Sequence, residues 1–258
     1  MNSTASFSTP AEEEGPCGNW TYHEWAEAFS TNDLARALPP WHIAVCRVQT
    51  GGRGRFNRKW IGEEGGLWAS FNVPLDTPAD AADGVDWGHL PLVAGLALLS
   101  MLRGMGLDSV RLRWPNDLLA GKSKLAGILV ERPAAHMAVI GIGINIFNDV
   151  AGIADMVQDP PARLADLVPD CPSIHEVMAS LGSHLNRVFT AFSKGGIPAI
   201  RDSLAEAWAE PRPVTIATDD EMIHGIFTGI DDQGNPVLSL PTGRRTIPAH
   251  LVNRLTEN

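Results

Sequence analysis

The sequence predicts an α/β fold of the α+β type, in which a large domain built on a mixed β-sheet precedes a small β-rich module. Apolar segments of strand length and of helix length alternate over most of the chain, and after Pro211-Arg212-Pro213 only short strands follow. The 258 residues, 44% of them hydrophobic, are enough for two domains. We therefore expect a disordered tail over residues 1–18, a main domain over 19–210 and a small domain over 211–258.

The elements of the main domain follow from apolar periodicity and from capping residues. Ser30 has the chemistry of a helix N-cap, with Asp33 at the reciprocal position, and Gly104 and Gly106 end the helix that begins at Leu90. We expect strands at 42–49, 66–73, 110–113, 125–131 and 138–144, and helices at 31–37, 90–102, 162–167, 174–192 and 200–208.

The small domain shows short alternating strands. They are expected at 214–217, 223–230, 236–240 and 245–247. The Asp-Asp-Gln-Gly-Asn turn at 231–235 joins the second and third of them as a hairpin. Strands of this number and length suit a small SH3-like barrel.

Composition limits the functional classes. A net charge of -10 argues against a nonspecific nucleic-acid binder, which needs a basic face. Residues 1–16 lack the basic start and apolar stretch of a signal peptide, and no apolar run reaches the length of a membrane helix. Three cysteines without metal spacing indicate a reducing compartment, and Cys46 lies in an apolar run typical of a core thiol. We expect a cytoplasmic protein that binds neither membrane nor nucleic acid.

The most informative segment runs from Gln49 to Trp60 and places three arginines and a lysine among glycines. Glycine allows close approach of the backbone to a ligand, and arginine matches carboxylate and phosphate groups. The segment is therefore a candidate anion clamp, although a solvated basic loop has the same composition. Two further segments are Arg-Leu-Arg-Trp-Pro-Asn-Asp at 111–117 with Lys-Leu-Ala-Gly-Ile-Leu-Val-Glu at 124–131, and Gly-Ile-Gly-Ile-Asn at 141–145.

With Ser30-Thr31-Asn32, these motifs occur in the order typical of the biotin protein ligases, which the chain resembles. The resemblance implies a catalytic domain of the biotin/lipoate ligase, class II synthetase-like type over 19–210 and an SH3-like C-terminal domain. It also implies a strand at 19–28, where the composition alone is helical. Only 29 residues precede Ser30, too few for the N-terminal DNA-binding domain of some members, so we expect the monofunctional type.

The resemblance implies a reaction in two steps. The biotin carboxylate attacks the α-phosphate of ATP to form biotinyl-5′-AMP and pyrophosphate, and a carrier-protein lysine then attacks the adenylate. Lys124, Arg53, Arg55 and Asp117 are the implied catalytic residues. Lys124 would hold the carboxylate and the α-phosphate, and Asp117 would orient Lys124 or the ribose or help to hold Mg²⁺. Lys122 is the rival cation, more typical of a solvated turn.

Two sets of binding residues follow from the same resemblance. Those implied for biotin are Ser30, Thr31, Asn32, Gln49, Gly52, Arg53, Gly54, Arg55, Trp68, Ser70, Lys124, Gly127, Gly141 and Gly143. Those implied for ATP are Arg55, Arg58, Trp60, Asn116, Asp117, Lys124 and Asn145. Purely structural roles stay open for some of them: an N-cap for Ser30, core packing for Trp60, and turn formation for Asn116 and Asp117.

The expected partner is the biotin carboxyl carrier protein or domain of a biotin-dependent carboxylase, and a homodimer is possible.

The chain departs from the family pattern at Gly51, where Ala is usual, and at Arg113, where Lys is usual. It also lacks the usual Gly-Asp or Gly-Glu before the last strand. Two alternatives remain: a lipoate or octanoate ligase, whose Arg-Arg-x-Ser-Gly-Gly-Gly pattern is absent here, and a non-catalytic biotin-binding protein, which would need no phosphate-binding cations.

Overall fold

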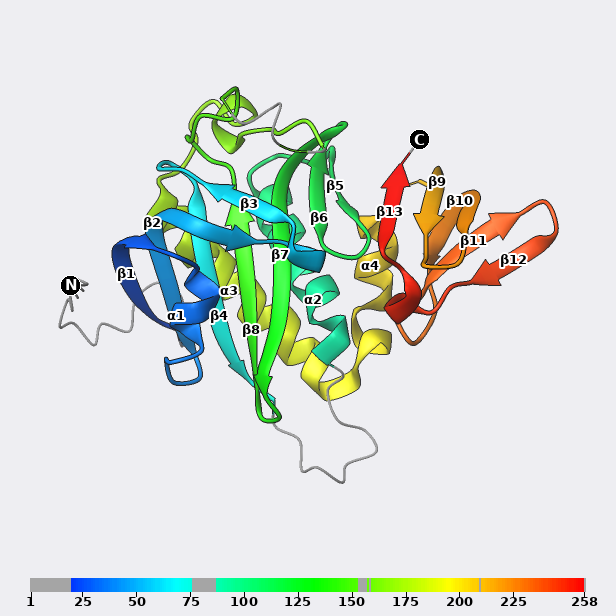
Figure 1. Cartoon of the computed structure of the whole chain (residues 1–258), viewed down its shortest axis with the longest axis horizontal. Coiled ribbons are helices and arrows are strands. Elements are labelled where there is room, and N and C mark those ends of the chain that lie inside the picture. Colours follow the sequence, from blue (N-terminus) through cyan, green and yellow to red (C-terminus); the bar gives the residue numbers. More distant parts are fainter. Residues whose placement is uncertain (1–19, 76–86, 153–156, 158, 209, 258) are drawn as a thin grey trace.

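The computed structural model describes the chain except for residues 1–19, 76–86, 153–156, 158, 209 and 258. The expected tail at 1–18, with Cys17, lies outside the described residues. The described part contains two β-sheets, and the smaller one begins at Arg212 (Figure 1). None of the described helices is long and apolar enough to cross a membrane.

The larger sheet is mixed, as predicted. Its strand order is β1-β2-β4-β8-β7-β6-β5, with β3 paired to β2 outside this path. Among the strand pairs of this sheet in the described residues, only β1–β2 is parallel. The strands are β1 (Thr21–Ala28), β2 (His42–Arg53), β3 (Lys59–Gly62), β4 (Leu67–Pro74), β5 (Val110–Arg113), β6 (Asp117–Ala120), β7 (Ser123–Ala134) and β8 (Met137–Ile144).

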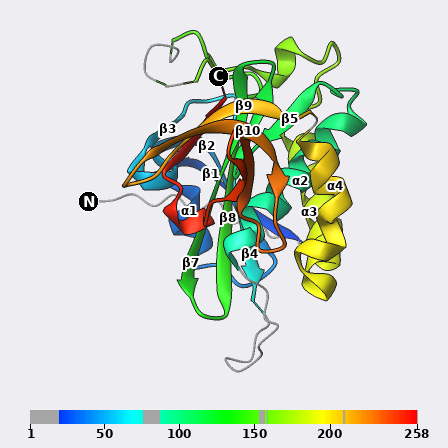
Figure 2. The same ribbon diagram turned by 90° about the vertical axis from the view of Figure 1, so that its right-hand side faces the viewer.

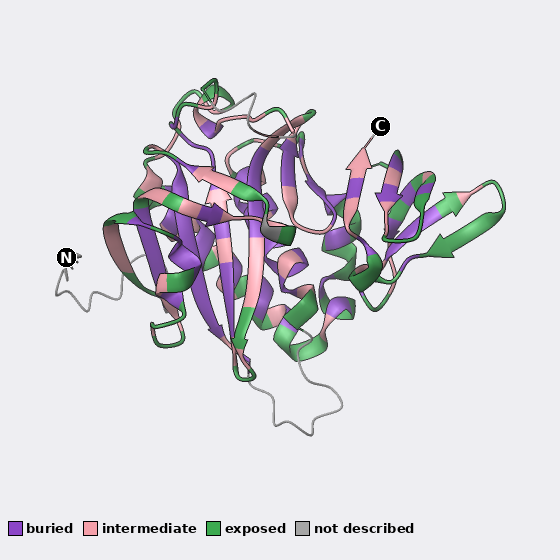
Figure 3. Ribbon diagram, viewed as in Figure 1, coloured by how far each residue is buried: buried purple, intermediate pink, exposed green. Residues whose placement is uncertain are grey.

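Different helices cover the two faces of this sheet. Helices α2 (Leu90–Gly104) and α3 (Ile174–Gly195) lie on one face, with α4 (Arg201–Ala207) beside them (Figure 2). They pack on the main core, to which alternate strand residues such as Ile43 and Phe71 belong. The short helix α1 (Thr31–Ala35) packs on the opposite face, where Ala35 meets Ala44 and Val139. Along β4 every residue from Leu67 to Val73 is buried, so this strand is covered on both faces (Figure 3).

The smaller sheet is antiparallel, with the order β12-β11-β10-β9-β13. Its strands are β9 (Arg212–Ala217), β10 (Met222–Ile230), β11 (Pro236–Leu240), β12 (Gly243–Thr246) and β13 (Arg254–Glu257). The predicted hairpin joins β10 and β11. Five strands of this kind fit the SH3-like fold class, and in the described residues the sheet runs open from β12 to β13.

Several elements differ from the sequence-based expectations. The helix expected at 162–167 is only a 3-10 turn, Leu164–Asp166, because the chain before it pairs with β7 through Pro160, Pro161 and Ala162 instead. Strands β3, β6 and β13 were not expected. The Ser30 side chain makes no capping hydrogen bond. Only its backbone oxygen takes part, by accepting hydrogen bonds from the N–H groups of Asp33 and Leu34 in α1. The strand implied at 19–28 is confirmed as β1, and Cys46 is buried, which raises its pKa to about 12.

The two sheets are held together by polar contacts. Trp114 Nε1 donates to the carbonyl of Gly234 at 3.1 Å in a buried position. Arg111 of β5 and Arg212 of β9 both pair with Glu257 of β13. The Arg111–Glu257 contact brings β13 to the edge of the larger sheet that carries β5 and β6.

Candidate active site

A cavity of about 350 Å³ lies on the α1 face of the larger sheet. The motifs predicted from the sequence meet around it. Its lining includes Ser30, Thr31, Asn32, Gln49, Arg53, Gly54, Arg55, Arg58, Trp60, Trp68, Asn116, Asp117, Lys124, Gly127, Gly141 and Gly143. Three residues at the start of β13, from Asn253 to Leu255, complete one side. Segments more than 200 residues apart in the chain therefore share one cavity.

Strand register explains why these side chains meet. Trp68 is paired with Gly143, Gly143 with Gly127, and Gly127 with Asp117. Paired residues of neighbouring strands point to the same face of a sheet. These four positions, on β4, β8, β7 and β6, therefore form one row across the floor of the cavity, large at Trp68, empty at the two glycines and charged at Asp117.

Trp60 fills the gap above the two glycines of this row. A methyl group at Gly143 would lie 2.6 Å from the Trp60 ring, and one at Gly127 would lie 2.8 Å from it. The indole also meets Trp68 edge to face at 6.1 Å between ring centroids. Its Nε1 is buried and has no hydrogen-bond partner among the described residues. Gly127 and Gly143, which we expected to let the backbone approach a ligand, thus make room for the Trp60 ring. Gly141 makes room for the Asn32 side chain.

A β-bulge turns Lys124 toward the cavity. The register of the β6–β7 pair shifts between Leu118 and Leu119, so that Ala126 pairs with Leu118 but Lys124 pairs with Leu119. Leu125 is the extra residue, and both Leu125 and Ala126 are fully buried in the core. Without the bulge, strict alternation would place Lys124 on the core face with Ala126. The bulge instead puts Lys124 on the same face as Asp117.

Lys124, Asp117, Arg113 and Asp159 alternate in sign and form what we call the charged chain. Lys124 Nζ lies 2.6 Å from Asp117 Oδ1, and Arg113 Nη2 donates to Asp117 Oδ2 at 2.6 Å. Arg113 also donates to both oxygens of Asp159 at 2.9 and 2.7 Å. Burial alone would lower the pKa of Arg113, but the hydrogen bonds of Arg113 to Asp159 and the charge of Asp117 raise this pKa above its ordinary value. The hydrogen bond from Arg113 in turn lowers the pKa of Asp159. Arg113 and Asp159 are therefore held ionised.

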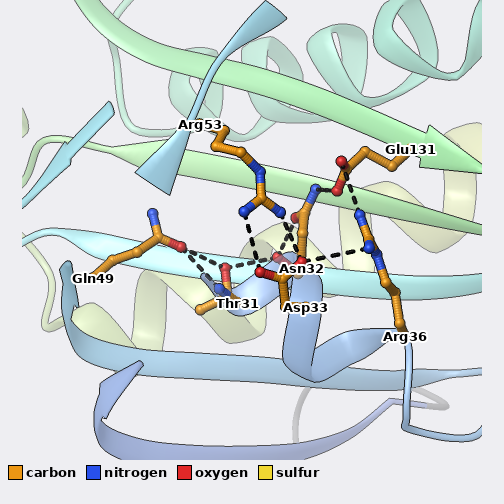
Figure 4. A network of polar contacts seen from close by, with 8 residues as sticks. Thr31, Asn32, Asp33, Arg36, Gln49, Arg53 and Glu131 are labelled. Atoms are coloured by element: carbon orange, nitrogen blue, oxygen red, sulfur yellow. Dashed lines mark hydrogen bonds and ion pairs between the residues drawn. The ribbon is translucent and has the colours of Figure 1, made fainter. Parts of the chain in front are cut away.

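Thr31, Asn32, Gln49 and Ser70 form an uncharged cluster at the other end of the cavity, here called the amide–hydroxyl network (Figure 4). Gln49 Oε1 accepts from the backbone nitrogen and the hydroxyl of Thr31 at 2.9 and 3.1 Å. Ser70 Oγ lies 2.7 Å from Thr31 Oγ1 and 2.6 Å from Asn32 Oδ1. Thr31, Asn32 and Ser70 are nearly inaccessible to solvent. Such a closed set of polar groups is rigid and can distinguish donors from acceptors on a ligand.

Two of the three arginines of the basic segment, Arg53 and Arg55, have partners in other parts of the fold. Arg53 makes a two-bond contact with Asp33 of α1 at 2.7 and 3.1 Å, which raises the pKa of Arg53 (Figure 4). Arg55 donates to the carbonyl of Val252 at 3.3 Å, and burial lowers its pKa. Arg58 lines the cavity and is exposed. The segment thus closes one side of the cavity by contacting α1 and the residues before β13.

Three predicted site residues do not line the cavity. Gly52 is buried beside Gln49, and Ser70 lies beneath Thr31 and Asn32. Asn145 is buried and faces the backbone oxygen of Lys124 at 3.5 Å and Asn148 at 3.1 Å, so it supports the strand that carries Lys124. Lys122, the rival cation, is exposed in the turn before β7.

Some residues that line the cavity were missed by the sequence reasoning. Asp159 has no motif around it, and it arrives because the segment 160–162 pairs with Lys124. Asn253, Arg254 and Leu255 come from the end of the small domain, where the chain lacks the usual Gly-Asp or Gly-Glu. Arg113 was noticed only as a departure from the pattern. The spacing of Arg113 and Asp117, four residues apart, was a weak signal for their pairing.

No cluster of three or more His, Cys, Asp or Glu side chains able to hold a metal ion occurs among the described residues. Asp117 and Asp159, the carboxylates in the lining of the cavity, are both bound by Arg113, and Asp117 is also bound by Lys124. Magnesium commonly binds through one or two carboxylates together with substrate phosphates. These residues fit an ion that enters with a polyphosphate better than one held by the protein alone.

Comparison with known proteins finds similar sequences for both parts of the chain. Residues 23–145 match the model of the biotin/lipoate A/B protein ligase family, and residues 212–249 match the biotin protein ligase C-terminal domain. The biotin–[acetyl-CoA-carboxylase] ligase of Paracoccus denitrificans is 32% identical over 238 residues, covering 87% of this chain and 96% of the relative. The bifunctional ligase/repressor BirA of Salmonella typhimurium is 33% identical, but the match covers 74% of this chain and 59% of the relative.

The fold is also shared with a solved structure. The biotin protein ligase of Aquifex aeolicus, determined in complex with biotin and ATP, superposes with a TM-score of 0.80 over 92% of this chain and 99% of that one. Sequence identity in this pair is 22%, so the likeness concerns the fold.

Proposed function

The chain belongs to the biotin protein ligase family, and from this premise we propose how its cavity carries out the two-step ligation of biotin. Biotin and ATP are the substrates, and biotinyl-5′-AMP is the intermediate. The observation that carries the proposal is that one cavity holds the amide–hydroxyl network at one end and the charged chain at the other. The first end suits a neutral bicycle with a ureido group, and the second suits a carboxylate meeting a phosphate.

In the first step an anion attacks a polyanion, so the repulsion between them must be cancelled. A biotin carboxylate oxygen forms a bond to the α-phosphorus of ATP while the bond to pyrophosphate breaks. We assign Lys124 to the developing charge, because Asp117 holds its ammonium group in the cavity and Arg113 holds Asp117. A cation fixed before the reaction stabilises the transition state without reorganisation.

The basic segment supplies the remaining positive charge. Arg53, Arg55 and Arg58 also line the cavity. The contact of Arg55 with Val252 ties the segment to the small domain. We propose that this closure excludes water from the adenylate, a mixed anhydride that water would hydrolyse. The unpartnered Trp60 Nε1 would then donate a hydrogen bond to the bound intermediate.

The second step transfers the biotinyl group to a protein. A neutral lysine ε-amine attacks the acyl carbon, AMP leaves with the electrons of the C–O bond that breaks, and the nitrogen loses one proton to solvent as the amide forms. We propose as acceptor the carrier protein or domain of a biotin-dependent carboxylase, by analogy with the printed activity of the Paracoccus ligase. A cytoplasmic location and the division into domains at 19–210 and 211–258 remain part of this proposal.

The test is exchange of labelled pyrophosphate into ATP, measured with biotin, lipoate and octanoate in turn. Exchange with biotin alone, lost in Lys124→Ala, supports both the activity and the assignment of Lys124. Exchange with lipoate or octanoate instead would move the chain to the other ligases covered by the matching family model. Tight biotin binding without any exchange would leave a binding protein.

A further inference from the structure

Glu131 lies next to the cavity without lining it and holds the Asn32 side chain. Its Oε2 accepts a hydrogen bond from Asn32 Nδ2 at 2.7 Å, and its Oε1 pairs with Arg36 Nη2 at 2.9 Å (Figure 4). Glu131 belongs to β7 and Asn32 to α1, 99 positions apart in the chain. An ionised carboxylate offers only acceptor atoms, so any uncharged group that contacts it must donate.

This contact fixes which end of the Asn32 amide faces the cavity. The oxygen and nitrogen of an amide have nearly the same shape, and only their partners distinguish them. The Ser70 hydroxyl does not determine the orientation of the amide, because a hydroxyl can donate or accept. Glu131 determines it, because in the opposite orientation Asn32 Oδ1 would lie 2.7 Å from Glu131 Oε2. Asn32 Oδ1 therefore lies over Gly141, beside Ser70 Oγ.

The fixed amide also sets the direction of the next two hydrogen bonds. Since Asn32 Oδ1 only accepts, the Ser70 proton points to it at 2.6 Å. Ser70 Oγ then accepts from Thr31 Oγ1 at 2.7 Å, a shorter contact than the 3.1 Å from Thr31 Oγ1 to Gln49 Oε1. The Thr31 backbone N–H continues to hold that Gln49 oxygen at 2.9 Å. In the series of side chains Thr31, Ser70 and Asn32, each therefore donates a hydrogen bond to the next, and Asn32 donates to the Glu131 carboxylate.

We infer that Glu131 is a specificity-determining positioning residue, which makes Thr31 and Asn32 present acceptor lone pairs to the cavity. This end of the cavity then selects a ligand that offers N–H donors. The inference rests on the proposed function, in which those donors are the two ureido N–H groups of biotin. Arg36 holds Glu131 in place and also lies 3.5 Å from Asp33, the partner of Arg53.

The first experiment measures ligand binding without ATP by calorimetry. Wild type and Glu131→Gln are compared with biotin and with biotin methylated on either ureido nitrogen. Wild type should bind at least one methylated ligand about tenfold more weakly than biotin, since one buried hydrogen bond is lost. In Glu131→Gln the Asn32 amide can turn, so biotin should weaken about tenfold and the preference over the methylated ligand should shrink toward one.

Kinetics separate positioning from general damage. Glu131→Gln should raise the KM for biotin about tenfold in pyrophosphate exchange and leave kcat within about twofold, because only binding of the bicycle changes. Glu27→Gln is the matched control, since Glu27 is an exposed carboxylate on β1, and it should leave both constants unchanged.

A reciprocal substitution tests the coupling directly. Asn32→Asp alone sets two carboxylates against each other and should weaken biotin about a hundredfold. Adding Glu131→Gln restores a donor–acceptor pair in the reverse sense and keeps an oxygen beside Ser70. The double variant should therefore bind biotin at least about tenfold more tightly than Asn32→Asp.

Two results overturn the inference alone: an unchanged preference in Glu131→Gln beside normal wild-type binding, or a double variant no better than Asn32→Asp. Thermal unfolding of each variant shows whether it is folded; if Glu131→Gln fails to fold, the comparison of Asn32→Asp with the double variant still decides. A wild type that binds no biotin would overturn the proposed function as well.

Discussion

The two ends of the cavity solve different problems with different chemistry. At the end formed by α1 and β4, the amide–hydroxyl network is neutral, closed and buried. At the end formed by β5, β6 and β7, the charged chain is built from four ions, and Lys124 still has about a quarter of its side chain exposed. Neutral groups in fixed orientation distinguish ligands, whereas ions held in advance stabilise developing charge. We therefore expect substitutions at the first end to change KM and those at the second to change kcat.

The largest effect is expected for Lys124→Ala. Loss of the cation should lower kcat for pyrophosphate exchange about a thousandfold. The biotin dissociation constant, measured without ATP, should change only a few-fold. Lys122→Ala is the matched control, two positions away and exposed, and should behave as wild type. A rise in the dissociation constant with unchanged kcat would show that the charged end serves binding instead.

A smaller loss is expected for Asp117→Asn. Asp117 receives both Lys124 and Arg113, so its neutral replacement leaves two cations without their shared anion. Lys124 should lose its fixed position, and kcat should fall about a hundredfold, as measured by pyrophosphate exchange. Asp108→Asn, an exposed carboxylate before β5, serves as control. Equal effects of both substitutions would contradict a specific role for Asp117.

The row of glycines gives a steric prediction. In Gly143→Ala the added methyl would lie 2.6 Å from the Trp60 ring, so the indole must move or the strand must shift. We expect a loss of about 1–3 kcal/mol in the free energy of unfolding, measured with denaturant. In Gly104→Ala, at the end of α2, the methyl meets nothing within 4 Å and should be neutral or slightly stabilising. Replacing Trp60 by Leu in Gly143→Ala should recover stability if the clash is the cause.

The smallest effect concerns pH. The bond from Arg113 lowers the pKa of Asp159 below its ordinary 3.8. A carboxyl group with a lowered pKa in the folded state stabilises that state above its unfolded pKa, and the contribution is lost as pH falls through the folded pKa. The melting temperature of wild type should therefore exceed that of Asp159→Asn at pH 7, and the difference should shrink below pH 3.8. A difference independent of pH would show that the effect is not electrostatic.

Regular elements with long apolar patterns could be predicted from the sequence. The α2 and α3 helices and most strands of both sheets lie within a few residues of their expected positions. Short strands were predicted unevenly: β5 and β12, of four residues each, were expected, whereas β6 and β13, of the same length, were not. Four residues carry little pattern, and whether they form a strand depends on pairing with neighbours. The helix expected at 162–167 failed for the same reason, since the backbone of the preceding residues found partners in β7.

The sequence by itself determined many of the chemical groups around the cavity, since local motifs carry Thr31, Asn32, Arg53, Asp117 and Lys124, but it did not indicate Asp159. Only the tertiary structure decided how those groups face one another. The bulge at Leu125 turns Lys124 to the cavity, and Glu131, 99 positions from Asn32, orients its amide. Such relations depend on strand register and on contacts between distant segments, which a pattern along one chain does not encode.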